Sequence, residues 1–449
     1  MKPIYIVSWL FALAVSFVSC DDWLDKTPKD RLYPDVYFKT EDELRLFTNQ
    51  FYNNLVPSAV DIYSESSDLI VKSDLMLEMS GQRIIPDEGN GWNFTALRDI
   101  NFYLQYSHNC TEVNARNRYD GVARFFRAYF YFEKVKRYGD IPWYDKALDS
   151  DDPELYKARD SREFVMQKML EDLDFAIANL PKTKNAYVLT RWTALALKSR
   201  VCLFEGTFRK YHGLEDCEKY LNACVSASET FMNESGYTLY KSGSTPYRDL
   251  FASINLQADE VIFGRDYEAS LSVLHNVQNY ENSTTMGRPG MNKKIVNSYL
   301  MADGSRFTDK AGYETMTFDQ ECQNRDPRLA QTIRTPGYTR IGSTKKEAPN
   351  LAYTMTGYHL IKYSMTANYD EYNKSCNDIP LFRTAEVYLN FAEAKAELGT
   401  LKQADINKSI KLLRDRVGMT NLDMELANSK PDPYLMSACL LYTSPSPRD

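Results

Sequence analysis

The chain has 449 residues, of which 43% are hydrophobic and 13% aromatic, so it can bury a sizeable core and is not intrinsically disordered. Its 54 basic and 61 acidic residues give a formal charge of −7, an acidic balance that argues against a nucleic-acid-binding role. The 4 histidines are widely scattered, which leaves little material for a histidine metal site or a histidine-based catalytic triad. Tyrosine is abundant, with 32 residues, and its ring combines an apolar face with a polar edge suited to hydroxyl-rich ligands.

The N-terminus has the pattern of an export signal. Residues 4–18 form an almost unbroken apolar run, which is too short to span a bilayer comfortably but has the length of a signal-peptide core. We therefore expect residues 1–19 to be a signal peptide. Cys20 follows Ser19 and resembles the cysteine of a bacterial lipobox, which is lipidated after cleavage. In that case Cys20 anchors the protein to a membrane and residues 20–40 form a tether. The alternative is an ordinary signal peptide that leaves Cys20 free.

The rest of the chain is predicted to be mainly helical. Apolar residues at helical spacing predict helices over residues 42–55, 94–109, 120–138, 161–180, 190–206, 215–232, 382–399 and 404–417. Thr40 is suited to cap the first of these helices, with Glu43 at the third helical position. Ser161 is suited to cap the fourth, and Gly139 to end the third. By contrast, residues 260–264 have the pattern of a short strand.

Two helix pairs, over residues 190–232 and 382–417, resemble each other. In each pair the first helix carries small residues at close-packing positions and is predicted to end at a glycine, Gly206 or Gly399. This pattern is typical of tetratricopeptide-like helical hairpins. We therefore predict a mainly all-α fold, in which a tetratricopeptide-like helical-hairpin scaffold carries an irregular, loop-rich insertion with short strands.

The scaffold is predicted to be interrupted twice, at about residues 61–93 and 233–377, within one domain over residues 41–433. The second interruption is rich in loop-forming residues. Long irregular segments on a rigid helical frame usually carry the function, so we expect the ligand site in these two segments.

Six stretches occur in an order that resembles the SusD/RagB family of Bacteroidetes outer-membrane lipoproteins. They are residues 19–28, 124–144, 192–206, 324–329, 382–399 and 412–419. The resemblance implies a scaffold of four tetratricopeptide-like repeats with an insertion that holds the ligand. It also implies a protein that binds glycans, or sometimes peptides, at the cell surface and forms a lid over a SusC-like TonB-dependent transporter.

The resemblance also bears on the two ends of the chain. The acidic pair Asp21-Asp22 resembles a surface-export signal, so we expect the protein on the outside of the outer membrane. Members of the family continue after the stretch that ends here at Met419 into a helix with a characteristic charged pattern, which is missing. We expect the chain to be C-terminally truncated and residues 434–449 to be a non-native tail, because its last ten residues, 440–449, have no helical period.

Three classes of function are compared: a binding protein, a glycoside hydrolase and a scaffold or adhesion protein. The sequence contains no serine-hydrolase elbow, zinc-protease helix, P-loop or dinucleotide fingerprint. A glycosidase needs only two carboxylates at a suitable separation, and sequence spacing alone does not exclude such a pair. The tidiest acidic group, Glu386, Glu393 and Glu397, is interpreted as a solvated helix face. We therefore predict a glycan-binding protein that is not an enzyme and that uses no cofactor or metal.

Sugar sites pair aromatic faces with side chains that hydrogen-bond hydroxyl groups. Trp143 and Trp192 lie in stretches that carry the family resemblance and are expected in the core. Trp92 stands in the polar segment 81–93, whose composition is that of a sugar-binding loop. The predicted ligand contacts in this segment are Arg83, Asn90, Trp92 and Asn93. The alternative is that Trp92 anchors the start of the next helix.

A second candidate loop covers residues 267–291. Asn279 and Tyr280 are the predicted ligand contacts there, before the family-like Pro289-Gly290. In the family that the chain resembles, stretches at these two places approach the ligand.

Overall fold

The computed structural model describes residues 37–63, 67, 69–86, 89 and 91–437. The predicted signal peptide, the predicted lipidation site Cys20 and residues 438–449 of the predicted tail lie outside the described residues. Residues 434–437 of that tail belong to a short helix, α20 (Pro433–Ser437), where the sequence predicted none. Within the described residues, no helix combines the length and the apolar character that crossing a membrane requires.

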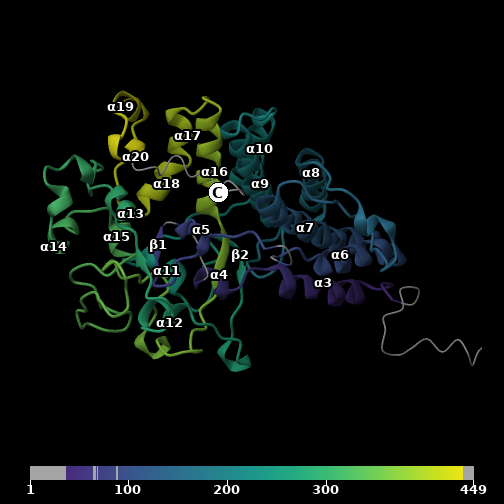
Figure 1. Cartoon of the computed structure of the whole chain (residues 1–449), viewed down its shortest axis with the longest axis horizontal. Helices are drawn as coiled ribbons and strands as arrows, with labels where there is room; N and C mark the ends of the chain where they lie inside the picture. Colours follow the sequence, from purple (N-terminus) through teal and green to yellow (C-terminus); the bar gives the residue numbers. More distant parts are fainter. Residues whose placement is uncertain (1–36, 64–66, 68, 87–88, 90, 438–449) are drawn as a thin grey trace, which may run out of the picture.

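Long helices dominate the first half of the chain. They are α3 (Glu41–Leu55), α6 (Thr95–Tyr106), α7 (Val113–Tyr138), α8 (Arg162–Asn179), α9 (Arg191–Tyr211) and α10 (Cys217–Glu234), with the short α4 (Ala59–Tyr63) and α5 (Leu77–Ser80) between the first two. Contacts link neighbours along the chain, α7 with α8, α8 with α9 and α9 with α10, as expected of stacked helical repeats (Figure 1). The mainly helical fold is confirmed, with α7 starting at Val113, earlier than predicted.

The last part of the scaffold comes from the far end of the described chain. It consists of α16 (Thr384–Glu397), α17 (Gln403–Asn407) and α18 (Ile410–Asp415). Helix α16 packs against α9 and α10 and so continues the helical stack (Figure 1). The single helix predicted over residues 404–417 is wrong, because Ser409 leaves the helical backbone at φ −134° and ψ −89°. Its hydroxyl donates to the Asp405 carbonyl at 2.6 Å.

The irregular insertion lies between α10 and α16, on the left of Figure 1. Its helices are α11 (Pro246–Ala252), α12 (Val277–Asn282), α13 (Lys293–Ser298), α14 (Phe318–Glu321) and α15 (Pro327–Ala330), and α19 (Met424–Ser429) follows the scaffold. Antiparallel strands β2 (Val261–Arg265) and β4 (Ile379–Arg383) join the two ends of the insertion, which confirms the predicted strand near residue 261. Strands β1 (Ile70–Val71) and β3 (Gly290–Met291) also pair antiparallel, so the two predicted interruptions of the scaffold meet in space.

Several predicted helix ends are confirmed by their hydrogen bonds. Thr40 and Glu43 form a capping box at the start of α3. The Ser161 hydroxyl accepts from the Phe164 amide at the start of α8. Helix α7 ends at Gly139, whose φ of +70° is one that side-chain-bearing residues rarely adopt.

Gly206 has a different role from the predicted one. It lies inside α9, which continues to Tyr211, so the prediction that the helix ends there is wrong. A Cβ atom at this position would lie 2.7 Å from Cγ of Leu221 in α10. The missing side chain therefore allows α9 and α10 to pack closely, and the glycine is a packing residue rather than a turn residue.

The largest apolar core lies between the helices of the first half. Phe51, Phe126 and Tyr131 are at most 1% exposed within it. Trp143 and Trp192 are 5% and 3% exposed, so the prediction that both are core residues is confirmed. Trp143 stacks on Tyr131 with ring centroids 4.3 Å apart, which fixes the chain segment that follows α7.

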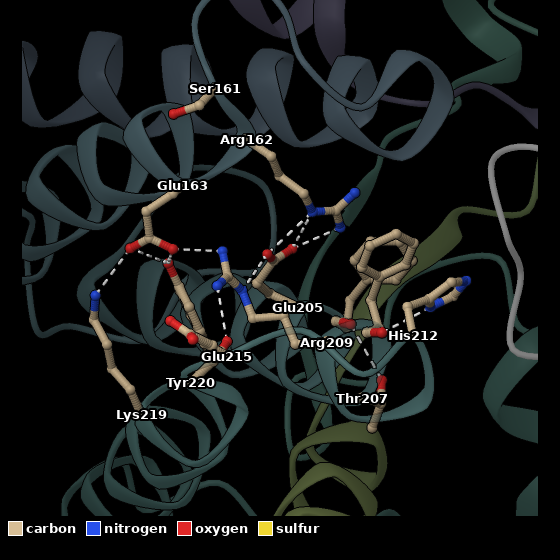
Figure 2. Close-up of polar contacts among 12 residues, drawn as sticks. Ser161, Arg162, Glu163, Glu205, Thr207, Arg209, His212, Glu215, Lys219 and Tyr220 are labelled. Atoms are coloured by element: carbon tan, nitrogen blue, oxygen red, sulfur yellow. Dashed lines mark hydrogen bonds and ion pairs between the residues drawn. The ribbon is translucent and has the colours of Figure 1, made fainter.

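A buried charge cluster ties α8, α9 and α10 together (Figure 2). Glu205 is fully buried, and its carboxylate accepts from Arg162 of α8 at 2.6 Å and from Arg209 at 2.7 Å. Arg209 also binds Glu163, which in turn accepts from Lys219 of α10 at 3.1 Å. Opposite charges alternate along this chain of contacts, so each buried ion has a partner.

Candidate functional site

A cavity of about 540 Å³ opens beside the N-terminal end of α6. One wall is the start of α6 with the segment before it, and the other is the stretch 142–159 between α7 and α8. Three aromatic residues line it: Trp92, Phe94 and Tyr144. This volume is in the range of small-molecule sites, and the combination of rings with polar groups is typical of them.

Helix α7 holds the segment that carries Trp92. Gly91 adopts φ +86°, and a Cβ atom there would lie 3.2 Å from the Tyr138 hydroxyl, so a glycine fits this close approach. The Lys134 ammonium donates to the Gly91 carbonyl. The Trp92 amide donates to the Gly89 carbonyl at 3.0 Å and closes the turn. The backbone beneath Trp92 is thus fixed to the scaffold.

The Trp92 ring is partly covered. It meets Tyr138 and Phe94 edge to face, with centroids 4.9 and 5.3 Å away, and the Arg159 guanidinium carbon lies 4.9 Å from its centroid. Trp92 nevertheless stays 40% exposed. The ring therefore anchors the segment before α6 and also presents an apolar surface to the cavity.

The opposite wall is built on the core. The Tyr144 amide donates to the Tyr131 hydroxyl at 2.6 Å, and the Asn101 amide group donates to the Tyr144 carbonyl at 2.8 Å. Lys157 donates to the Trp143 carbonyl at 2.7 Å and lies 5.1 Å from the centroid of the Tyr144 ring. Burial, followed by nearby carboxylates, raises the pKa of Tyr144, so its phenol stays neutral at physiological pH.

The predicted contacts of the first segment have different surroundings. Trp92 lines the cavity, whereas Arg83 and Asn93 are not part of its lining. The Asn93 side chain accepts from the Thr95 amide at 2.8 Å and so binds the backbone at the start of α6. Asn90 lies outside the described residues. A ligand contact by Arg83, Asn90 or Asn93 remains a prediction.

Asn279 and Tyr280 are not in an exposed loop, and that part of the prediction is wrong. They belong to α12, in which all six residues are buried, and they are 8% and 3% exposed. The Asn279 amide group donates to the Asp370 carbonyl at 2.7 Å, and the Tyr280 ring packs 5.9 Å from that of Tyr63. The polar side chains of this stretch bind neighbouring loops, which a composition-based prediction does not distinguish from binding a ligand. Helix α12 lies on the other side of the molecule from α6 (Figure 1).

The basic residues of the cavity were not predicted from the sequence. Arg98, Lys146, Lys157 and Arg159 all line it. Three of them follow the Gly-Asp-Ile-Pro turn after α7 and lie beyond residue 144, where the stretch that carries the family resemblance ends. The sequence contains no clear signal for them, because five acidic residues lie in the same segment, 142–159.

A second hollow, of about 750 Å³, lies at residues 403–428 and has no aromatic residue in its lining. It therefore lacks the stacking surface that the cavity at Trp92 offers. Among the residues that the structure describes, no group of three or more His, Cys, Asp or Glu side chains could hold a metal ion.

Two family models match the chain. One, described as the SusD family, matches residues 250–437, and the other, described as "Starch-binding associating with outer membrane", matches residues 82–191. The second match includes both walls of the cavity. The chain belongs to the SusD family.

Related proteins and solved structures agree with SusD-family membership. SusD-like protein P2 of Formosa agariphila is 25% identical over 93% of this chain and 82% of its own length. SusD-like protein P25 of the same organism is 21% identical over 95% of this chain and 84% of its own length. A SusD-like protein of Bacteroides fragilis matches with a TM-score of 0.70 and 21% identity, covering 94% of this chain and 86% of the other. A SusD-like carbohydrate-binding protein of the same species matches with a TM-score of 0.71 and 18% identity, covering 92% and 85%.

SusD-family membership decides between the functional classes compared from the sequence. The family consists of non-catalytic proteins, so this chain is not an enzyme and the glycoside hydrolase hypothesis is wrong. Two of the three residues of the acidic group that was interpreted as a solvated face are engaged in ion pairs, since Glu386 binds Arg200 at 2.5 Å and Glu397 binds Lys210 at 2.7 Å, whereas Glu393 is exposed.

Proposed function

We propose that this SusD-family protein captures oligosaccharides in the cavity between α6 and the 142–159 stretch. The observation that carries the proposal is the exposed Trp92 ring, which lines a cavity of about 540 Å³ together with Tyr144 and several hydrogen-bond donors. The C–H face of a sugar packs against aromatic rings, and its hydroxyl groups accept hydrogen bonds from nearby cations and amides. The name of one solved relative, a SusD-like carbohydrate-binding protein, supports the same ligand class.

The proposal includes delivery to a transporter. We propose that the protein is anchored through a lipid on Cys20, on the outside of the outer membrane, and hands its ligand to a SusC-like TonB-dependent transporter. Support comes from the apolar run before Cys20 and from the family description "Starch-binding associating with outer membrane". A peptide ligand, as in RagB-like proteins, is the alternative to a glycan.

The test is a binding titration. Purified protein with Cys20→Ala is titrated with starch, mucin, N-glycan and plant oligosaccharides, and with unstructured peptides, by calorimetry and tryptophan fluorescence. We expect at least one glycan to bind, with a stoichiometry of one, and Trp92→Ala to weaken that binding. Binding of peptides but of no glycan would favour the alternative. Release of reducing sugar from a bound glycan would contradict the non-catalytic assignment.

A further inference from the structure

All charged side chains that line the cavity are basic. Arg98 comes from α6, and Lys146, Lys157 and Arg159 come from the opposite wall. The chain as a whole has the opposite sign, with a formal charge of −7. The cavity is therefore positively charged, although the chain as a whole is negative. This favours a negatively charged ligand, which the average surface of the protein repels.

The two lysines are partly neutralised by the protein. Lys146 lies 3.0 Å from Glu154 and 3.4 Å from Asp152, and Lys157 lies 2.9 Å from Asp160. These carboxylates do not line the cavity, but they balance part of the charge of the two lysines.

The two arginines have no such counterion. Arg98 donates to the Leu148 carbonyl at 3.2 Å, and Arg159 donates to the Tyr138 and Asp140 carbonyls at 3.4 Å. Among the residues that the structure describes, no carboxylate lies within ion-pair distance of either guanidinium group. Carbonyl groups orient a guanidinium without cancelling its charge, so both arginines keep their attraction for an anion.

Arg159 is also next to the proposed stacking surface. Its guanidinium carbon lies 4.9 Å from the centroid of the Trp92 ring, which remains 40% exposed. An acidic group on a sugar ring packed against Trp92 is thus within reach of Arg159, and Arg98 lines the same cavity. Guanidinium groups bind carboxylate and sulfate oxygens through paired hydrogen bonds, which neutral hydroxyl groups match less well.

We propose that the ligand of this cavity is an anionic glycan, one that carries carboxylate or sulfate groups, and that Arg98 and Arg159 bind those groups. The inference rests on the proposed function and narrows it to a charged class of oligosaccharide.

The test uses matched ligands that differ only in charge. Tetragalacturonate is compared with its methyl ester, and a sulfated carrageenan tetrasaccharide with its desulfated form, by calorimetry at low salt. We expect at least one anionic oligosaccharide to bind with about tenfold or higher affinity than its neutral counterpart. The galacturonate pair tests recognition of carboxylates, and the carrageenan pair tests recognition of sulfates. Raising the salt concentration is expected to weaken only the anionic member.

Variants assign the preference to the arginines. Arg98→Gln and Arg159→Gln are each expected to weaken binding of the anionic ligand more than binding of the neutral one, and so to reduce the preference for the anionic ligand. Arg118→Gln is the matched control, because Arg118 is an exposed arginine of α7 that pairs with Glu41 at 3.4 Å. It is expected to change the affinity for neither the anionic nor the neutral ligand. Circular dichroism and thermal unfolding check that each variant is folded.

The outcomes separate the two proposals. Equal affinity for charged and neutral members, or binding of neutral glycans alone, would overturn the anionic inference and leave the glycan-binding proposal intact. Failure of every glycan in the wider panel would overturn both. An anionic preference that survives both arginine substitutions would refute the assignment to Arg98 and Arg159.

Discussion

The Arg159 guanidinium packs on the Trp92 ring, with its central carbon 4.9 Å from the ring centroid. A cation at this distance from an indole face is attracted by the ring electrons. The contact joins two segments of the cavity lining that are far apart in sequence. Trp92 is thereby kept in place, and 40% of it stays accessible.

The first prediction concerns Trp92. Trp92→Ala is expected to lower the unfolding free energy by about 1 kcal/mol, because the ring loses its contacts with Phe94 and Tyr138 but was already partly exposed. Glycan affinity is expected to fall by about 1–3 kcal/mol, by analogy with lost base stacking. Urea unfolding measures the change in stability, and calorimetry measures the change in affinity. Trp92→Phe keeps an aromatic ring, so its stability and affinity are expected to lie between those of the wild type and Trp92→Ala. Loss of the fold in Trp92→Ala would mean that anchoring is its main role.

The buried charge cluster gives the second prediction. Glu205→Ala leaves Arg162 without its partner and removes one partner of Arg209, so we expect a loss of about 3–5 kcal/mol of unfolding free energy. Glu171→Ala is the control, because Glu171 pairs with Lys168 on the surface of the same helix bundle and is expected to matter by less than about 1 kcal/mol. Equal unfolding midpoints for the two variants would refute the role given to Glu205.

The third prediction concerns the close packing of α9 and α10 at Gly206. Gly206→Ala places a methyl group 2.7 Å from Cγ of Leu221, so we expect a destabilisation of about 1–3 kcal/mol. Adding Leu221→Ala should make Gly206→Ala less costly, since the clashing atoms are gone. A double-mutant cycle by chemical denaturation measures this coupling. Strict additivity would show that Leu221 is not the neighbour that requires a glycine.

The fourth prediction is a pH dependence of stability at Glu281. Burial raises the pKa of this carboxyl to about 7, from an ordinary value of 4.5, against the opposing effects of the Ser364 hydroxyl, the Tyr363 amide and the charges of Arg340 and Arg248. Between these two values the native state holds more protons than the unfolded state, so this group makes the protein less stable as the pH rises.

Glu281→Gln removes that titration. We expect the variant to gain stability relative to the wild type by about 1–3 kcal/mol as the pH rises from 4.5 to 7. Urea unfolding across this range measures the difference. The buried His275 and His359, whose pKa values burial lowers, are present in both proteins and cancel in the comparison. A difference that does not change with pH would contradict the raised pKa.

The fifth prediction concerns location. Cys20→Ala is expected to leave the protein unlipidated, because Cys20 is the proposed attachment point. Metabolic labelling with a fatty acid measures this, and labelling that persists in Cys20→Ala would contradict the proposal. Cys110→Ala, at a buried core position, is the control and is expected to keep the label.

Local signals predicted much of the scaffold. The Thr40 and Ser161 caps depend on hydrogen bonds between residues three positions apart, so they can be predicted from the local sequence. Gly206 was misread, because a glycine that ends a helix and one that admits a neighbouring helix look alike until the neighbour, Leu221, is placed. Tertiary contacts decide between the two.

The ligand site was predicted only in part, for the same reason. Trp92 was found because it is an aromatic residue in a polar segment. Tyr280 has similar neighbours in sequence but packs inside the insertion, at 3% exposure, because loops distant in sequence cover it. Arg159 was missed because its place beside Trp92 depends on how the 142–159 stretch folds back onto α6.

A crystal structure of the protein with the tightest-binding oligosaccharide of the panel tests the central claim most directly. We predict a sugar ring against Trp92 and Tyr144, with Arg98 and Arg159 within hydrogen-bond distance of the ligand. An oligosaccharide bound elsewhere, with the cavity at Trp92 holding only water, would contradict the account.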